Sequence, residues 1–230
     1  MAQQAPMQDI RWHRFGDKDE MDQHVAKAIT ELANKTIANK GSFHIVLAGG
    51  DTPRDIYSLL RQSETDWSRW HVYFSDERCQ PAHFPERNDV MARETLLDYV
   101  PVPAAQVHAI PAELPQPECV AQYTQTLSAV GTFDLVLLGI GHDCHTASLF
   151  PGYNWGRGAG APAVLAFDRA PANPPHRISL SANRLSDAKH VWFLVCGPGK
   201  QQALLRWQSG EFLPLSAINP PGGLDVFVAP

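Results

Sequence analysis

The stretch FHIVLAGGDTP, residues 43–53, decides the fold class. Its first six residues form an apolar run as long as one buried strand, and Gly49-Gly50 then predicts a tight turn. Thr52 followed by Pro53 predicts the beginning of a helix, with Thr52 as its N-cap and the proline at the first helical position. A buried strand that turns directly into a helix is the repeating unit of a parallel α/β sheet.

The same alternation extends along the chain in both directions. Towards the N-terminus, residues 10–15 predict a strand, and Asp17 with Glu20 begins a helix whose apolar residues recur at helical spacing as far as Ile37. Further strands are expected at 71–74, 107–110, 133–140, 164–167, 178–180, 191–196 and 225–228. Further helices are expected at 118–130, at 200–207 and after Asn88, which is the expected cap. We therefore expect one domain over residues 1–230, built on an open, mostly parallel sheet, with a flexible segment at residues 1–9.

Composition excludes several classes of protein. The 230 residues are 44% hydrophobic and 19% charged, which suits a packed core and argues against a disordered chain. The net charge of -5, with no basic run, argues against a nucleic-acid partner. No apolar run approaches the roughly 20 residues that a membrane span needs, and the first ten residues lack the pattern of a signal peptide. Four scattered cysteines without CxxC spacing indicate reduced thiols, so we expect a cytoplasmic protein, as a monomer or weak homodimer.

Polar segments follow four of the predicted strands directly. Ligands of open parallel α/β sheets bind beyond the carboxyl ends of the strands, so these segments predict a site. They are GGDTP at 49–53, SDER at 75–78, GHDCHTAS at 141–148 and GPGK at 197–200.

Three of these segments have both a chemical and a purely structural interpretation. The backbone of Gly49 and Gly50 can approach an anion or a sugar, or it can simply form a turn. Asp76 and Arg78 can orient hydroxyls and bind an oxyanion, or they can belong to a solvated charged turn. Lys200, after two glycines and at a helix start, predicts a phosphate contact, and Arg177 is a further candidate for binding an anion.

The fourth segment, residues 139–148, allows several chemistries. Gly139 and Gly141 form a GxG without the third glycine of a dinucleotide fingerprint. The His, Asp and Cys residues at 142–145 could bind zinc, although no second pair of ligands with suitable spacing is visible. Cys144 could be a nucleophile, and His145 could be a general base oriented by a carboxylate. A polar loop without chemistry is the remaining alternative.

Six segments together resemble the 6-phosphogluconolactonase family, in the same order and along nearly the whole chain. They are LAGGDTP at 47–53, FSDER at 74–78, residues 88–103, DLVLLGIG at 134–141 with HTASLFPG at 145–152, PPHRISL at 174–180 and FLVCGPGK at 193–200. The resemblance implies a modified doubly wound (Rossmann-like) α/β fold, with a mostly parallel sheet flanked by helices and a small β-rich excursion. It also implies hydrolysis of 6-phospho-D-glucono-1,5-lactone to 6-phospho-D-gluconate, in the pentose phosphate pathway and without metal or cofactor.

On this resemblance, each candidate residue receives a role. His145 is the expected general base, Asp143 orients its loop or its imidazole, and Arg78 stabilises the oxyanion. Lys200 and Arg177 are expected to hold the 6-phosphate of the lactone. The residues expected to line the sugar are Gly49, Gly50, Thr52 and Asp76.

Two alternative functions and two departures from the family pattern accompany this assignment. A sugar-phosphate isomerase or deaminase would use Asp76 as its base, and a binding protein would hold the sugar phosphate without turnover. Cys144 stands where the family has glycine, and His142 stands where proline or an acid is usual. If position 144 needs a positive φ, a cysteine there costs on the order of 1 kcal/mol and could displace His145.

Overall fold

The computed structural model describes residues 8–230. Its strands are β1 (Ile10–Arg14), β2 (Phe43–Leu47), β3 (Trp70–Phe74), β4 (Asp76–Arg78), β5 (Val107–His108), β6 (Phe133–Gly139), β7 (Val164–Phe167), β8 (Arg177–Leu180), β9 (Ala188–Cys196) and β10 (Leu224–Ala229). Its α-helices are α1 (Lys18–Lys40), α2 (Asp51–Leu60), α3 (Asn88–Ala92), α4 (Gln116–Ser128), α5 (Ala182–Ser186) and α6 (Gln201–Gln208).

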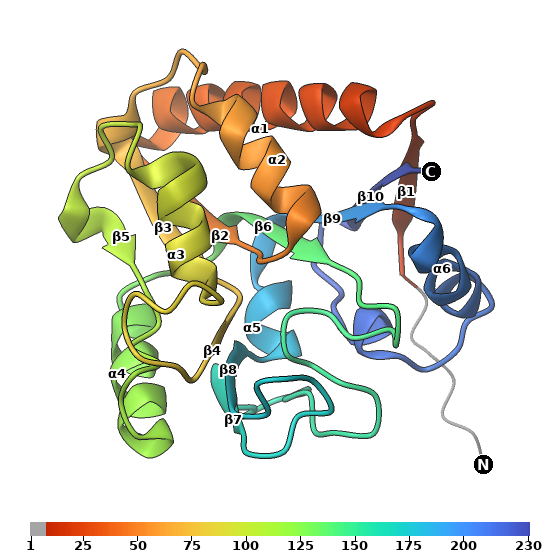
Figure 1. The fold of residues 1–230 in the computed structure, drawn as a ribbon. Coiled ribbons are helices and arrows are strands. Elements are labelled where there is room, and N and C mark those ends of the chain that lie inside the picture. The colour runs from red at the N-terminus through yellow and green to blue at the C-terminus, as the bar shows by residue number, and fades with distance from the viewer. Residues whose placement is uncertain (1–7) are drawn as a thin grey trace.

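Seven of the strands form one sheet, in the order β1-β10-β9-β6-β2-β3-β5, and every neighbouring pair in it is parallel (Figure 1). The other three form a small antiparallel sheet in the order β4-β8-β7, which lies beside the large one. The mostly parallel α/β fold with a small β-rich excursion is therefore confirmed. Because β4 follows β3 after a single residue, the small sheet is tied to the carboxyl end of the large one.

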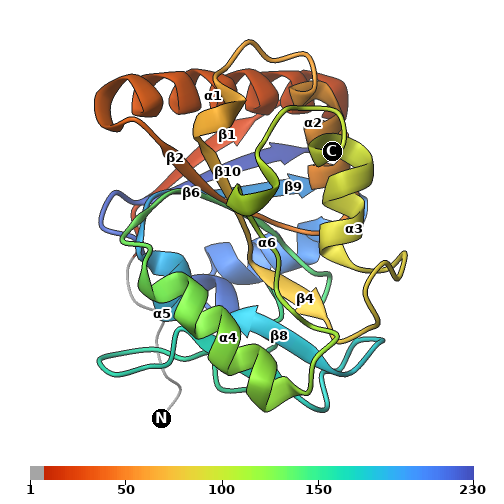
Figure 2. The same cartoon turned by 90° about the vertical axis from the view of Figure 1, so that its left-hand side faces the viewer.

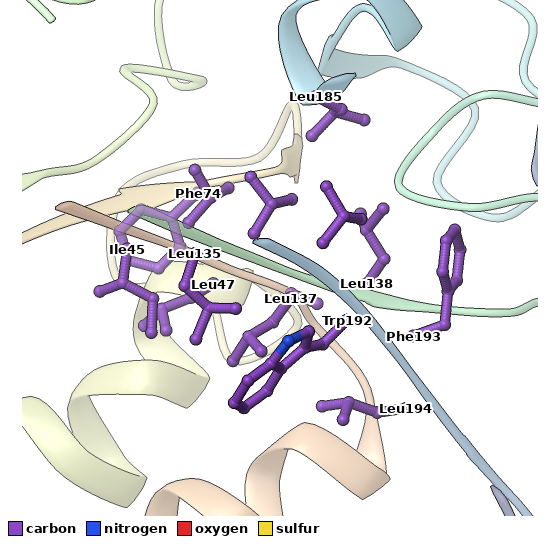
Figure 3. Packing of buried hydrophobic residues seen from close by; sticks show 14 of the residues in the cluster. Ile45, Leu47, Phe74, Leu135, Leu137, Leu138, Leu185, Trp192, Phe193 and Leu194 are labelled. Carbon is purple, nitrogen blue, oxygen red and sulfur yellow. The ribbon is translucent and has the colours of Figure 1, made fainter. Parts of the chain in front are cut away.

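Helices cover both faces of the large sheet. Figure 2 shows α1 and α2 on one side and α4, α5 and α6 on the other. The central strands are apolar on both faces, as a sheet covered on both sides requires. In Figure 3, Leu137 and Trp192 point to one face, whereas Leu138 and Phe193 point to the other, towards Leu185 of α5. Burial of these side chains on both faces fixes the register of the sheet.

Two helix starts differ from the prediction. α2 begins at Asp51 with Gly50 as its N-cap, two residues earlier than the cap predicted at Thr52, and Gly50 adopts a φ of 104°, which glycine tolerates because it has no Cβ. α3 has Arg87 as its N-cap, and Asn88 is its first helical residue. The Asn88 side chain instead contacts β4, where its Nδ2 donates to the backbone carbonyl and the carboxylate of Asp76.

Two short elements were not predicted. β4 carries the sequence DER, whose charges conceal a strand that pairs with β8, with Asp76 opposite Ser179 and Arg78 opposite Arg177. α5 is too short to show helical periodicity. The segment expected to be flexible, residues 1–9, lies outside the described residues except for Gln8 and Asp9. Gln8 donates hydrogen bonds from Nε2 to the carbonyl oxygens of Leu215 and Ile218.

Candidate active site

A pocket of about 320 Å³ lies at the carboxyl ends of β2, β3 and β6. It brings together seven of the nine residues proposed from the sequence, namely Gly49, Gly50, Asp76, Arg78, His145, Arg177 and Lys200. The other two do not line it: Asp143 contacts His145, and Thr52 lies in the first turn of α2. Segments far apart in the sequence therefore converge where the order of the strands predicts a site.

His145 is held by a carboxylate. Its Nδ1 lies 2.5 Å from Oδ1 of Asp143, and its backbone N–H donates to the same oxygen over 3.2 Å. Partial burial acts to raise the pKa of Asp143, but the hydrogen bonds and the charge of His145 outweigh it and lower that pKa to about 2. Asp143 is therefore ionised at neutral pH and can only accept, so Nδ1 carries the proton. The lone pair of the neutral imidazole is then on Nε2.

Close packing explains why glycine stands at position 141, before Asp143 and His145. A Cβ on Gly141 would lie 2.1 Å from Nδ1 of His145 and 2.6 Å from Oδ1 of Asp143. No other residue leaves room for the imidazole and the carboxylate at this place. The Gly141 N–H also donates to the carbonyl oxygen of His145 over 2.8 Å, which closes the turn.

With cysteine at position 144, His145 still contacts Asp143 and lines the pocket. Cys144 adopts a φ of 71°, so the family glycine stands at a left-handed position that the cysteine occupies here with strain. Its side chain is fully buried, and burial raises the pKa of its thiol. Because Cys144 does not line the pocket and its thiol is held protonated, the structure does not favour it as a nucleophile.

Two other interpretations of this loop are also disfavoured. A dinucleotide fingerprint needs a helix directly after the glycines, whereas the chain from Ile140 runs through turns to β7. Over residues 8–230, no group of three or more His, Cys, Asp or Glu side chains is arranged to hold a metal ion.

Three cationic side chains face the pocket. Arg78 and Arg177 stand opposite each other on β4 and β8, and Lys200 lies at the start of α6. Arg177 is buried and donates to the carbonyl oxygens of Pro174 and Asn173, at 2.7 and 3.1 Å. Burial is the main cause that lowers the pKa of Arg177, and the charge of Arg78 acts in the same direction. Two arginines side by side on neighbouring strands repel each other, and an anion between them would relieve that repulsion.

Asp76 is the only carboxylate among the described residues that line the pocket, and it is already hydrogen-bonded. Oδ2 accepts from Ser148 at 2.6 Å, and Oδ1 accepts from Ser75 at 3.1 Å and from Asn88 at 3.2 Å. These donors are neutral, so the three cationic side chains of the pocket are opposed only by the single carboxylate of Asp76 among the described residues that line it. Three residues of the segment SDER are buried, namely Ser75, Asp76 and Glu77, so this segment is not a solvated turn.

Glu77 does not line the pocket but connects two elements that do. It is fully buried, and its carboxylate accepts hydrogen bonds from the backbone N–H groups of Arg78, Asn88 and Asp89 at 2.7–2.9 Å. Burial raises the pKa of Glu77, while these three donors oppose that effect. The buried guanidinium of Arg87 lies 4.0 Å away. Glu77 thereby joins β4 to the start of α3.

Asn88 and Phe150 line the pocket and were not predicted to do so. A Cβ on Gly49 would lie 2.0 Å from Oδ1 of Asn88, so this glycine makes room for the amide. The sequence gives no sign of this contact, because Asn88 lies 39 positions further along the chain. The ring of Phe150 lies 4.8 Å from that of His145 and forms an apolar wall beside it.

The chain matches one family of known proteins. The family model described as "Glucosamine-6-phosphate isomerases/6-phosphogluconolactonase" matches residues 16–227. A 6-phosphogluconolactonase from Synechocystis is 35% identical over 189 residues, which are 76% of this chain and 75% of that protein. A 6-phosphogluconolactonase from Streptomyces coelicolor is 35% identical over 203 residues, with 80% and 77% covered. The crystal structure of 6-phosphogluconolactonase from Thermotoga maritima superposes with a TM-score of 0.87 at 27% identity, over 95% of this chain and 99% of that one.

Proposed function

This chain belongs to the family of glucosamine-6-phosphate isomerases and 6-phosphogluconolactonases, and on that premise we propose that His145 is its general base. The reaction is the hydrolysis of 6-phospho-D-glucono-1,5-lactone to 6-phospho-D-gluconate, a step of the pentose phosphate pathway. One observation carries the role of His145. Its Nδ1 is held by an ionised carboxylate, which leaves the basic Nε2 for a pocket with three cationic side chains.

The proposed reaction needs one water molecule and one proton shuttle. Nε2 of His145 takes a proton from water as the oxygen attacks the carbonyl carbon of the lactone, and a tetrahedral oxyanion forms. When the bond between that carbon and the ring oxygen breaks, the imidazolium returns the proton to the ring oxygen. The product is a carboxylic acid, which ionises and releases one proton. Asp143 stabilises the imidazolium between these two steps.

Arg78 is the proposed partner of the oxyanion. Its Nη1 donates to the carbonyl oxygen of Glu86, while its buried Nε has no hydrogen-bond partner among the described residues. A buried donor without a partner is unfavourable until a ligand accepts from it. One well-placed donor to an oxyanion lowers the barrier by roughly 3 kcal/mol.

Arg177 and Lys200 are proposed to hold the 6-phosphate. The chain as a whole carries a net charge of -5, so a pocket with three cations and one hydrogen-bonded carboxylate is a local exception that suits an anionic substrate. Gly49, Gly50 and Asp76 are proposed to line the sugar. We assign no contact to Thr52, because it lies outside the pocket.

The structure disfavours the isomerase or deaminase as the reaction of this chain. That chemistry would need Asp76 as a base that takes a proton from the substrate. Both carboxylate oxygens of Asp76 already accept hydrogen bonds from Ser75, Asn88 and Ser148, so this carboxylate is engaged in holding the structure of the site.

We also propose a cellular location, an oligomeric state and a set of partners for this chain. Over residues 8–230, no helix has both the length and the apolarity to cross a membrane. The four cysteines are free thiols, which supports a cytoplasmic location. We propose that the chain acts on its small phosphorylated substrate as a monomer or weak homodimer, without a nucleic-acid partner.

The decisive experiment follows proton release from freshly generated 6-phosphogluconolactone, above the spontaneous rate. The wild type should accelerate it, and glucosamine 6-phosphate should yield no ammonia. Lys200→Ala should raise KM for the phosphorylated lactone and leave the hydrolysis of unphosphorylated gluconolactone nearly unchanged. Ammonia release by the wild type, or binding of the lactone without turnover, would contradict the proposal.

A further inference from the structure

The loop that carries His145, residues 140–150, holds a conformation that its own residues do not favour. We call it the catalytic loop. Cys144 and Ala147, on either side of His145 in the chain, both have left-handed φ values, 71° and 48°. Non-glycine residues keep such values only where the surrounding contacts impose them. Contacts that hold this loop therefore decide where the imidazole lies.

The hydrogen bonds within the catalytic loop shape it but do not connect it to the small sheet on the other side of the pocket. Thr146 Oγ1 donates to the carbonyl oxygen of Gly139 over 2.8 Å, and Thr146 and Leu149 exchange two backbone hydrogen bonds. These bonds remain within the loop or join it to the end of β6, from which it extends.

Ser148 makes two hydrogen bonds that cross from the loop to the small sheet. Its Oγ donates to Oδ2 of Asp76 on β4 over 2.6 Å, and its backbone N–H donates to Oγ of Ser179 on β8 over 3.2 Å. Ser148, Ser179 and Asp76 are all buried, so water does not compete for these bonds. The bond to Asp76 has an ionisable acceptor, which makes it the stronger kind of contact.

Asp76 is itself fixed from two other directions. Asn88 of α3 donates to its side chain and to its backbone carbonyl, and Ser75 donates to Oδ1. Ser148 therefore connects the catalytic loop to the part of the molecule that also places Arg78 and Asn88 in the pocket. Ser148 does not line the pocket, so we expect no contact between it and the substrate.

We propose that Ser148 is a positioning residue, whose hydrogen bond to Asp76 holds the catalytic loop so that His145 faces the substrate and the cationic side chains. This inference rests on the proposed function, because it assumes that His145 is the base. A base that shifts by about 1 Å loses roughly 100-fold in rate, and binding of the substrate depends on other groups. Loss of the Ser148 contact should therefore lower kcat far more than it changes KM.

The test uses Ser148→Ala, Ser148→Cys and the control Ser216→Ala. Ser216 is also buried and hydrogen-bonded, to Leu213, and it lies outside the pocket. With the lactone as substrate, Ser148→Ala should lower kcat by roughly 10- to 100-fold with KM changed by less than about threefold. Ser148→Cys leaves the site filled, with a somewhat larger sulfur in place of the oxygen, and has only a weak donor, so it should lower kcat in the same direction even if the alanine variant fails to fold. Ser216→Ala should leave kcat unchanged.

Hydrogen exchange of the backbone amides in residues 139–150 supplies a readout that needs no activity. Exchange there should become faster in the Ser148 variants and stay unchanged in Ser216→Ala. Wild-type protein that hydrolyses no lactone would refute the proposed function, whereas exchange would still decide whether Ser148 holds the loop. Unchanged kcat or unchanged exchange in the folded Ser148 variants would overturn the positioning role. So would a raised KM with normal kcat, because that would make Ser148 a substrate contact.

Discussion

The two ends of the large sheet use histidine in opposite ways. At the carboxyl ends, His145 is half-exposed to a pocket and rests on an ionised carboxylate. Near the amino ends of β2 and β3, the rings of His44 and His71 stack 4.6 Å apart, and His108 of β5 stacks next to His71 at 5.8 Å. Burial is the main cause that lowers the pKa of all three, to about 4 for His44. The same residue type is therefore the proposed base at one end and part of a stacked, largely buried ring cluster at the other.

Carboxylates differ between the two ends in the same manner. Near the amino ends, the buried Asp134 lies 2.7 Å from Nζ of Lys40 and 3.2 Å from Nζ of Lys189, and it accepts from the backbone N–H of His44. At the carboxyl ends, Asp76 accepts from neutral donors while the cations of the pocket face open space. The charge of Asp134 is thus paired within the protein, whereas the cationic side chains of the pocket remain available to a ligand.

Apart from changes to His145 itself, the largest expected effect at the carboxyl ends comes from Asp143→Asn. A neutral amide no longer stabilises the imidazolium and can hold the wrong tautomer of His145, so kcat should fall by roughly 10²–10⁴-fold. The free energy of unfolding should change little, because the Asp143 side chain is partly exposed. Proton release from the lactone measures kcat, and urea denaturation measures the free energy of unfolding. A variant with near-normal kcat would remove Asp143 from the mechanism.

The support behind the pocket should show the largest effect on stability. Glu77→Ala leaves three backbone N–H donors without an acceptor and removes a buried carboxylate that lies 4.0 Å from the Arg87 guanidinium, which should lower the free energy of unfolding by about 3–5 kcal/mol. Glu77→Gln keeps one acceptor oxygen and should lower it by roughly 1–3 kcal/mol. Glu113 also pairs with Arg87 but is exposed, so Glu113→Gln should lower it by less than about 1 kcal/mol. Equal losses at Glu77 and Glu113 would contradict this assignment.

The amino-end histidines should make stability depend on pH. Their pKa values are lowered on folding, so the unfolded chain binds more protons as the pH falls below about 6.5, the usual histidine pKa. The contribution of these neutral histidines to the free energy of unfolding is complete above that pH and is lost as the pH falls towards 4. Tm should decrease through this window, by about 2–4 °C for each kcal/mol lost.

The matched variant for this effect is His44→Gln, because His44 has the pKa that is lowered most among the three. Its Tm should vary less between pH 6.5 and 4 than that of the wild type. If the wild type and the variant show the same slope, the stacked histidines do not control the acid sensitivity of the fold.

The smallest effect is expected for Cys144→Gly. Glycine relieves strain on the order of 1 kcal/mol at the left-handed position, but it removes a buried side chain and loosens the unfolded chain by a similar amount. The free energy of unfolding should therefore stay within about 1 kcal/mol of wild type. Because His145 already contacts Asp143 with cysteine in place, kcat should stay within about twofold. A large gain in kcat would mean that the cysteine displaces His145 in solution.

Sequence reasoning succeeded where local pattern controls structure. The apolar run of β6 and the helical spacing of α1 identified buried elements, and the chain order of strands and helices then placed their carboxyl ends together. The GHDCHTAS loop was identifiable because it directly follows such a strand.

Contacts between distant segments were not predictable in the same way. Ser148 donates to Asp76, which is 72 positions away in the sequence, and the Asn88 side chain packs against Gly49. No periodicity in the sequence links the residues of either pair. β4 was missed because its buried polar side chains are satisfied by partners from other elements, which a local pattern does not reveal. Position 144 lay between these cases. The family glycine suggested a left-handed residue, and the structure shows that Cys144 adopts this conformation, with a φ of 71°.

The most direct test of the central claim compares the histidines at the two ends of the sheet. His145→Gln and His44→Gln would be assayed together for hydrolysis of freshly generated 6-phosphogluconolactone, above its spontaneous rate. The account predicts that kcat falls roughly 10²–10⁴-fold in His145→Gln and stays at the wild-type value in His44→Gln. Wild-type kcat in a folded His145→Gln protein would contradict it, and the base would then have to be found elsewhere in the pocket.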